Sequence, residues 1–274
     1  MRSVPFVAIA LTCGLSAPAA AQTGSQSNLV LTIFGGAVTG HSLWTVSKQP
    51  LCVLDAGNTC TAQDDTLEIS KSIGSSVVVG ASATYFVSPL VALHAELSFL
   101  GLPVESHCAG VYYNAEAQNK NRQVCNGLQA LTGAGGAITA FGGVTLRGAS
   151  RRALSPYVRG NLGLVSHSHS TTDMVGVFVD TTGGSRAVFI REVVADPRPG
   201  QTSLMLGAAV GFTSAVGTGY QFRLELRDLM TSLERVTGPA NAQAVAPTAS
   251  RFYHHIALTL GLDVVLERKR GRRY

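Results

Sequence analysis

The sequence predicts an all-β fold, an eight-stranded antiparallel up-and-down transmembrane β-barrel with short periplasmic turns and four long extracellular loops. Three observations predict it. The chain begins like an exported protein, and eight segments alternate apolar and polar residues at the length of a membrane-crossing strand. The connections between these segments alternate between short and long, as in an outer-membrane barrel.

The first 21 residues have the three parts of a secretory signal peptide. Arg2 precedes an apolar run from Val4 to Leu15, and small residues then lead to an A-x-A site at 19–21. We therefore expect cleavage after residue 21 and export of the remaining chain from a bacterial cytoplasm.

The composition favours a barrel among exported proteins. Hydrophobic residues make up 46% of the chain and charged residues only 14%, against roughly 25% in ordinary soluble domains. After the signal peptide, no stretch approaches the roughly 18 consecutive apolar residues that a membrane helix needs. An exported, apolar, glycine-rich chain without a spanning helix is typical of a protein that crosses the outer membrane with strands.

Eight segments show period-two alternation or a glycine-rich β pattern, and most have the roughly 9–11 residues that a tilted membrane strand needs. Their ranges are 28–39, 75–87, 90–100, 134–147, 155–165, 202–214, 218–229 and 252–266. Short turns join the second to the third, the fourth to the fifth and the sixth to the seventh, while the other four connections are long, polar and irregular. The even number of strands places both chain ends on the side of the short turns.

The polar faces of these strands are expected to line the lumen, because the alternate residues of a membrane barrel face lipid and must be apolar. Six charged residues fall on this inner face: Glu96, Arg159, Arg223, Glu225, Arg227 and Asp263. His94 and Gln221 share it. Buried charges are tolerated when they are paired, so we expect Glu96 and Asp263 to pair with arginines and Arg159 to pair with Glu225. A network that fills the lumen is the main interpretation; a gate for ions or small solutes and a catalytic carboxylate are the alternatives.

The layout, the signal peptide and the charged stretch RLELRD at 223–228 resemble the small eight-stranded outer-membrane barrels of the OmpA/OmpX type. The resemblance covers the mature chain and includes no catalytic motif. It implies a location in the bacterial outer membrane, contact with its lipids and lipopolysaccharide, and insertion by the barrel-assembly machinery. One feature departs from the family, because TLGLDVVL at 259–266 is aliphatic and the terminal aromatic residue is displaced to Tyr274.

Four cysteines remain after cleavage of the signal peptide: Cys52, Cys60, Cys108 and Cys125. An even number in an oxidising compartment indicates disulfides, with three possible pairings. We favour the local pairs 52–60 and 108–125. Zinc is the rival interpretation, but the chain contains no C-x-x-C pair.

The long loops are where specificity is expected in such a barrel. Their aromatic and basic residues either contact a surface partner or pack the loops on themselves, and the sequence leaves both open: Trp44, Tyr112, Tyr113, Lys120 and Arg122. His167 and His169 face one side of an extended segment, but without a third ligand they predict a polar loop rather than a metal site. We expect no metal and no other cofactor.

The domain organisation is therefore a signal peptide at 1–21, a barrel at 22–266 and a basic periplasmic tail at 267–274. The tail is suited to anionic phospholipid headgroups. A nucleic-acid partner is excluded, because the positive charge is terminal and the chain is exported.

Three classes of function are compatible with this organisation. The first is a non-enzymatic outer-membrane barrel with a largely plugged lumen that serves envelope integrity or surface contact. The second is a narrow channel for ions or small solutes. The third is an enzyme that modifies lipid A, for which His169, Ser170 and Glu192 are the nearest candidates although their spacing does not match that family. A soluble lipocalin-like barrel is the architectural rival, and the charged inner face argues against it.

Overall fold

The computed structural model describes residues 29–51, 65–111, 115–130, 133, 135–148, 154–167, 169–180, 187–196, 201–217 and 219–266. Three predictions lie outside the described residues: the signal peptide, the Cys52–Cys60 pair and the basic tail at 267–274. Among the described residues, no helix is long and apolar enough to span a membrane.

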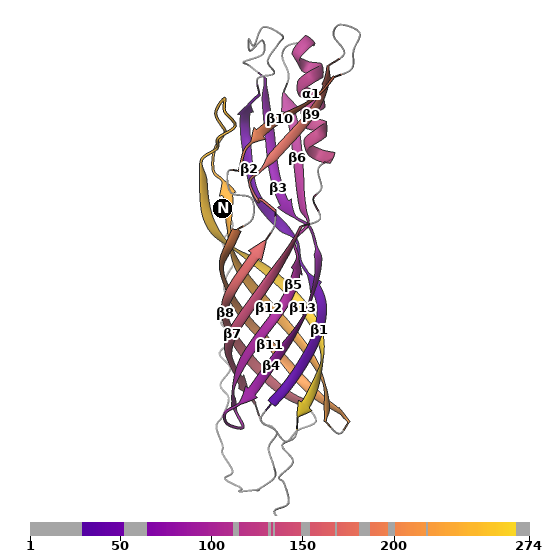
Figure 1. Cartoon of the computed structure of the whole chain (residues 1–274), viewed down its shortest axis with the longest axis vertical. Coiled ribbons are helices and arrows are strands. Elements are labelled where there is room, and N and C mark those ends of the chain that lie inside the picture. The colour runs from indigo at the N-terminus through magenta and orange to yellow at the C-terminus, as the bar shows by residue number, and fades with distance from the viewer. Residues whose placement is uncertain are drawn as a thin grey trace, which may run out of the picture.

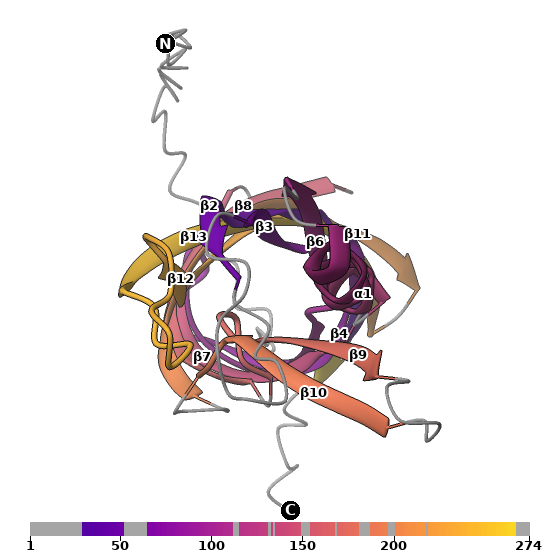
Figure 2. The same cartoon turned by 90° about the horizontal axis from the view of Figure 1, so that it is seen from above.

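The core of the structure is a closed, antiparallel barrel of eight strands, which confirms the predicted fold class. Figure 1 shows the strands inclined around a common axis, and Figure 2 shows the ring that they form when viewed from above. Around the ring they follow the order β1-β13-β12-β11-β8-β7-β5-β4. Their bounds are β1 Leu29–Val38, β4 Ser76–Phe86, β5 Val91–Gly101, β7 Gly136–Arg147, β8 Leu154–His167, β11 Gln201–Gly217, β12 Tyr220–Val236 and β13 Thr248–Leu266.

Each barrel strand corresponds to one of the eight predicted segments. The first and last strands close the ring, with Leu29 opposite Leu266 and Val38 opposite Ala257. On its other side Leu29 lies opposite Tyr85, next to the short turn between β4 and β5. Both ends of the barrel chain are therefore at the end of the short turns, as the even strand number predicts.

Side chains alternate strictly between the outside and the inside of the barrel. On β13, Ile256, Leu258, Leu260 and Leu262 point outward and are 37–54% exposed, while their neighbours in sequence are buried. The same apolar row continues on the other strands. Because successive side chains of a strand point to opposite faces, the period-two pattern of the sequence becomes an apolar outer belt and a polar lumen.

Of the long connections at the other end, the fourth, at 237–247, contains no helix or strand. The first three build a second layer of structure, so the prediction of irregular loops is wrong for these three. They contain β2 (His41–Pro50), β3 (Thr66–Ile73), β6 (Val104–Val111), α1 (Ala115–Ala130), β9 (Met174–Asp180) and β10 (Ala187–Val194). β2, β3 and β6 form a three-stranded sheet, and β9 pairs with β10. We call these six elements the head; Figure 1 shows it stacked on the barrel along the long axis.

The three-stranded sheet of the head continues the barrel wall. In the barrel β1, β4 and β5 are neighbours, and in the head their chain continuations β2, β3 and β6 are neighbours in the same order. Glycine is required where the wall leaves the ring, because a Cβ on Gly40 would lie 2.4 Å from the carbonyl oxygen of Ile73. The chain therefore bends there at a backbone contact that a side chain would block.

The apolar core of the head is continuous with buried apolar side chains of the barrel strands. β3 buries Leu67 and Ile69 completely, and α1 buries Val124 and Leu128 on one face, four residues apart as helix geometry requires. The disulfide between Cys108 of β6 and Cys125 of α1 fixes the helix to the sheet, which confirms one of the two predicted pairs.

Candidate functional site

The lumen holds the charged residues that the alternation pattern places inside. They come from four strands: Glu96 from β5, Arg159 from β8, Arg223, Glu225 and Arg227 from β12, and Asp263 from β13. Each of the six is at most 5% exposed. A buried charge is costly unless another group compensates it, so the distances between these groups decide what the lumen can do.

Four of them form a central cluster. Arg227 Nη1 lies 2.6 Å from Glu96 Oε1, and Arg227 Nε forms a second ion pair with Glu225 Oε1. Arg159 Nη1 lies 3.2 Å from Glu225 Oε2 and 3.9 Å from Glu96 Oε2. Each carboxylate thus touches two arginines and each arginine two carboxylates, which is an arrangement that neutralises all four charges.

The remaining ion pair lies nearer to the short turns. Arg223 donates from Nη2 and Nε to Asp263 Oδ2 at 3.0 and 3.3 Å. The other carboxylate oxygen accepts a hydrogen bond of 2.8 Å from Thr32 Oγ1. Tyr157 connects the pair to the central cluster, because its hydroxyl donates to Glu225 at 2.5 Å and its ring lies 5.5 Å from the Arg223 guanidinium.

Two further polar residues that the pattern places inside, His94 and Gln221, also take part. His94 Nε2 lies 3.2 Å from Glu96 Oε2, and His94 Nδ1 lies 3.1 Å from Thr84 Oγ1. Gln221 lines a cavity of about 20 Å³ together with Arg223 and Asp263. A single water molecule needs roughly 10–15 Å³ of such space, so this cavity is about the size of one water.

A group of aromatic and imidazole side chains lies where the barrel meets the head. Thr231 Oγ1 is 2.6 Å from His255 Nε2, and the ring of His255 lies edge-on to the ring of His41, with 4.7 Å between centroids. The ring of Tyr253 stacks on His41, and its hydroxyl donates to the Leu43 carbonyl. His255 belongs to the predicted inner face, whereas His41 was missed, because it comes from a head strand that the sequence pattern did not reveal.

In the part of the chain that the structure describes, no three His, Cys, Asp or Glu side chains gather as a metal site. His167 and His169, considered from the sequence as a weak metal site, contact each other through a side chain and the backbone: His167 Nδ1 lies 2.8 Å from the backbone oxygen of His169. The chemistry of the lumen is therefore that of paired ions and hydrogen bonds.

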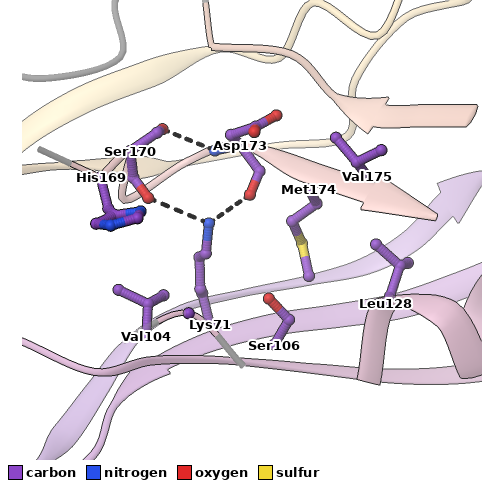
Figure 3. A pocket seen from close by; sticks show the side chains of 10 residues that line it. Lys71, Val104, Ser106, Leu128, His169, Ser170, Asp173, Met174 and Val175 are labelled. Carbon is purple, nitrogen blue, oxygen red and sulfur yellow. Dashed lines mark hydrogen bonds between the residues drawn. The ribbon is translucent and has the colours of Figure 1, made fainter. Parts of the chain in front are cut away.

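The head contains a second site, a pocket of about 350 Å³ between β3, β6, α1 and the segment that leads into β9. Figure 3 shows Lys71 reaching from β3 toward the backbone of this segment. Lys71 Nζ donates to the carbonyl oxygen of Ser170 at 3.3 Å and also to that of Asp173. Burial lowers the pKa of Lys71 from 10.5 to about 8, although Asp173 and Asp196 oppose this shift. Burial likewise raises the pKa of Asp173.

The three candidates for a lipid A-modifying enzyme do not form a triad among the described residues. The Ser170 hydroxyl donates to the Asp196 carboxylate and accepts the backbone N–H groups of Thr172 and Asp173, at 3.1 and 2.9 Å. This is the hydrogen-bond pattern of a serine that caps a turn. Glu192 lies on β10 opposite Val175.

Of the aromatic and basic residues that the sequence places in the long loops, Trp44 and Lys120 have contacts within the head. Trp44 is buried, and its indole N–H donates to the Thr171 carbonyl at 2.9 Å, so this aromatic residue packs the head on itself. Lys120 of α1 lies over the ring of Phe178 at 5.8 Å. Arg122 lies on the same helix, and Tyr112 and Tyr113 are outside the described residues.

No family model and no curated protein matches this chain. Among solved structures, it is similar to Neisserial surface protein A (NspA), with 12% identity, 87% of this chain and 97% of that chain covered, and a TM-score of 0.41. It is similar to the outer membrane protein OprG from Pseudomonas aeruginosa, with 11% identity, 89% and 99% covered, and a TM-score of 0.45. It is also similar to the outer membrane protease OmpT from Escherichia coli, with 7% identity, 88% of this chain and 98% of that chain covered, and a TM-score of 0.37. At these identities and TM-scores, no property of those proteins is carried over to this chain.

Proposed function

We propose that this chain is a non-enzymatic integral protein of the bacterial outer membrane, with a salt-bridged lumen that is largely plugged and a folded head displayed outside the cell. The observation that carries the proposal is the inverted polarity of the barrel. Its outer face is apolar and exposed, and its charges are buried inside.

The outer belt is suited to lipid and poorly suited to water. Monomeric soluble proteins rarely expose contiguous apolar patches larger than a few hundred Å². Here large apolar side chains on every barrel strand are exposed, including Ile33, Leu97, Ile138, Leu162 and Val210, each at 53–64%. In a bilayer the same side chains lie in hydrocarbon, and the closed ring leaves no unpaired strand edge.

The ion pairs of the lumen favour a plug over a channel. An eight-stranded barrel has room only for the side chains that fill it. The cluster of Glu96, Arg159, Glu225 and Arg227 spans the lumen from β5 to β8 and β12, and its members bind one another. A solute would have to separate these pairs in order to pass.

The same pairing supports a structural role over catalysis. A catalytic carboxylate or serine needs a reacting partner within hydrogen-bond distance. Glu96 and Glu225 contact arginines, His94 and Tyr157, and the Ser170 hydroxyl is used by Asp196 and a turn. We therefore assign envelope integrity and surface contact through the head, and we retain kinship with the OmpA/OmpX type, the signal peptide at 1–21 and a lipid-binding tail at 267–274 as parts of the proposal.

Cell fractionation tests the location. Protein recovered from an outer-membrane fraction is expected to migrate differently on a gel before and after boiling, because a folded barrel resists detergent at room temperature. Recovery of the protein wholly in the soluble periplasm would contradict the proposal.

Planar-bilayer recording tests the plug. The refolded protein is expected to show no large, steady conductance, and Arg227→Ala is expected to raise the conductance because it removes one of the two arginines that join Glu96 to Glu225. Arg251→Ala, at an exposed position of β13, is the matched control and should behave like the unmodified chain. A large conductance of the unmodified protein would favour the channel instead.

A further inference from the structure

The pocket of the head is a cavity to which the proposed function assigns no role. Its volume of about 350 Å³ is within the range of roughly 300–1,000 Å³ that is usual for small-molecule sites. Figure 3 shows that side chains from the sheet, from α1 and from the segment before β9 surround it. The head presents this pocket on elements that are fixed by a sheet and by the Cys108–Cys125 disulfide.

Lys71 lies on the buried face of β3, where the other side chains are apolar. On β3 it follows Leu67 and Ile69 on the buried face and precedes Ile73, and it is only 5% exposed. A buried ammonium must be compensated by hydrogen bonds. Its three N–H groups have two acceptors among the described residues, the carbonyl oxygens of Ser170 and Asp173. One N–H remains for a group inside the pocket.

The rest of the lining is divided between apolar and polar groups. Val104 and Val175 provide apolar surface, while Leu128 and Met174 lie behind it and are fully buried in the head core. Ser106 and His169 contribute polar atoms near Lys71. A ligand that satisfies both halves is amphiphilic, with one hydrogen-bond acceptor and one short apolar part.

The charges around Lys71 select an uncharged acceptor. The carboxylates of Asp173 and Asp196 lie close enough to act on the Lys71 ammonium. An anionic ligand at Nζ would meet these two carboxylates, while a cationic ligand would meet the ammonium itself. A carbonyl or hydroxyl oxygen accepts the free N–H without adding charge.

We propose that this pocket binds a small uncharged amphiphile, whose carbonyl or hydroxyl oxygen accepts a hydrogen bond from Lys71 and whose apolar part packs against Val104 and Val175. The site is extracellular if the barrel spans the outer membrane, but the binding itself depends only on the head.

Trp44 provides the measurement. It is the single tryptophan of the chain, and its indole N–H is bonded to Thr171 in the segment that borders the pocket. The full-length refolded protein is titrated with three probes that share a five-carbon chain: pentanamide, pentanoate and pentylamine. At about pH 6.5 Lys71 is protonated, because its pKa is about 8.

Pentanamide is expected to change the Trp44 fluorescence saturably, with an apparent Kd at least about tenfold below those of pentanoate and pentylamine. Lys71→Met should weaken pentanamide binding by at least about tenfold, while Lys48→Met, at an exposed position of β2, should leave it unchanged. Equal or tighter binding of either charged probe overturns the proposal, as does the absence of saturable binding up to the solubility limit. Because the comparison of probes uses the unmodified protein, the proposal is tested even if Lys71→Met fails to fold.

Failure of this binding test leaves the barrel proposal intact. The gel-migration and conductance experiments measure the barrel, and the fluorescence titration measures the head.

Discussion

Removing either partner of the ion pair between Arg223 and Asp263 should destabilise the barrel, and removing both should cost less than the sum of the two single changes. In Arg223→Met the Asp263 carboxylate keeps, of its contacts with Arg223 and Thr32, the 2.8 Å hydrogen bond from Thr32, and in Asp263→Asn the guanidinium loses the negative charge that its two bonds to Oδ2 compensate. Removal of one partner of a buried pair costs about 3–5 kcal/mol. Each single variant should therefore shift the folding equilibrium by a factor of roughly 100 to several thousand.

The double variant Arg223→Met with Asp263→Asn leaves no uncompensated charge. Its cost should fall below the sum of the two single variants by about 1–3 kcal/mol. Urea titration of protein folded in lipid vesicles measures the three free energies of unfolding. Gel migration and far-ultraviolet circular dichroism must report the folded fraction, because the single tryptophan, Trp44, lies in the head. Single variants within about 0.5 kcal/mol of the unmodified protein, or strictly additive costs, would refute the idea that this pair stabilises the lumen.

Three further predictions test the belt, the disulfide and the buried lysine. Leu258→Arg should lower the free energy of unfolding in lipid vesicles by about 2–4 kcal/mol. The control Val245→Arg, in the connection between β12 and β13, should lower it by less than about 0.5 kcal/mol, although Val245 is 59% exposed and Leu258 54%. Equal effects would mean that the belt does not face lipid. Replacing Cys108 and Cys125 by serine should destabilise the head by about 3 kcal/mol and speed its proteolysis while the gel migration of the barrel is retained; loss of barrel folding would contradict this division. The pKa of Lys71 is about 8 in the folded chain and 10.5 ordinarily, so between these pH values the unfolded chain binds more protons than the folded one. The free energy of unfolding should therefore rise with pH in this range, by at most about 3 kcal/mol relative to Lys71→Met. Unfolding followed by Trp44 fluorescence measures this rise, and parallel pH curves of the two proteins would refute it.

The barrel strands were predictable because their outward side chains are mostly apolar and their inward ones mostly polar or small, which gives the sequence a period of two. The prediction for the seventh strand ended at residue 229, whereas β12 continues to Val236. The reason is Asp228, an outward residue bound to His254 at 2.8 Å, which interrupts the apolar row. The pattern therefore follows the height of the belt, while strand pairing continues beyond it.

The head was missed because its strands are not marked in the same way. On β3 the buried face contains Lys71, so the alternation of Leu67 and Ile69 is broken at the residue that forms the ligand pocket. A signal was present in β9 and β10, whose runs MVGVFVD and AVFIREVV are rich in β-branched and aromatic residues and are separated by a glycine-containing segment. Helix α1 has a mostly polar sequence, and only its buried face, with Val124 and Leu128, reveals its packing.

The continuity of the head sheet with the barrel wall explains why the two layers can be stabilised by different means. If the barrel spans the membrane as proposed, the side chains of the outer belt face lipid that is as apolar as they are, so they gain nothing from burial, while Glu96, Arg227 and their partners help to fill the lumen. In the head, which the proposal places in water, burial of apolar side chains is favourable, and α1 packs both against β6 of the wall and against β9. The bend at Gly40 lies between the part of the wall that belongs to the barrel and the part that belongs to the head. Buried charged side chains therefore have different roles on the two sides of this bend. In the lumen they pair with one another and fill the space. In the head core, Lys71 has a hydrogen bond to offer to the ligand that we propose.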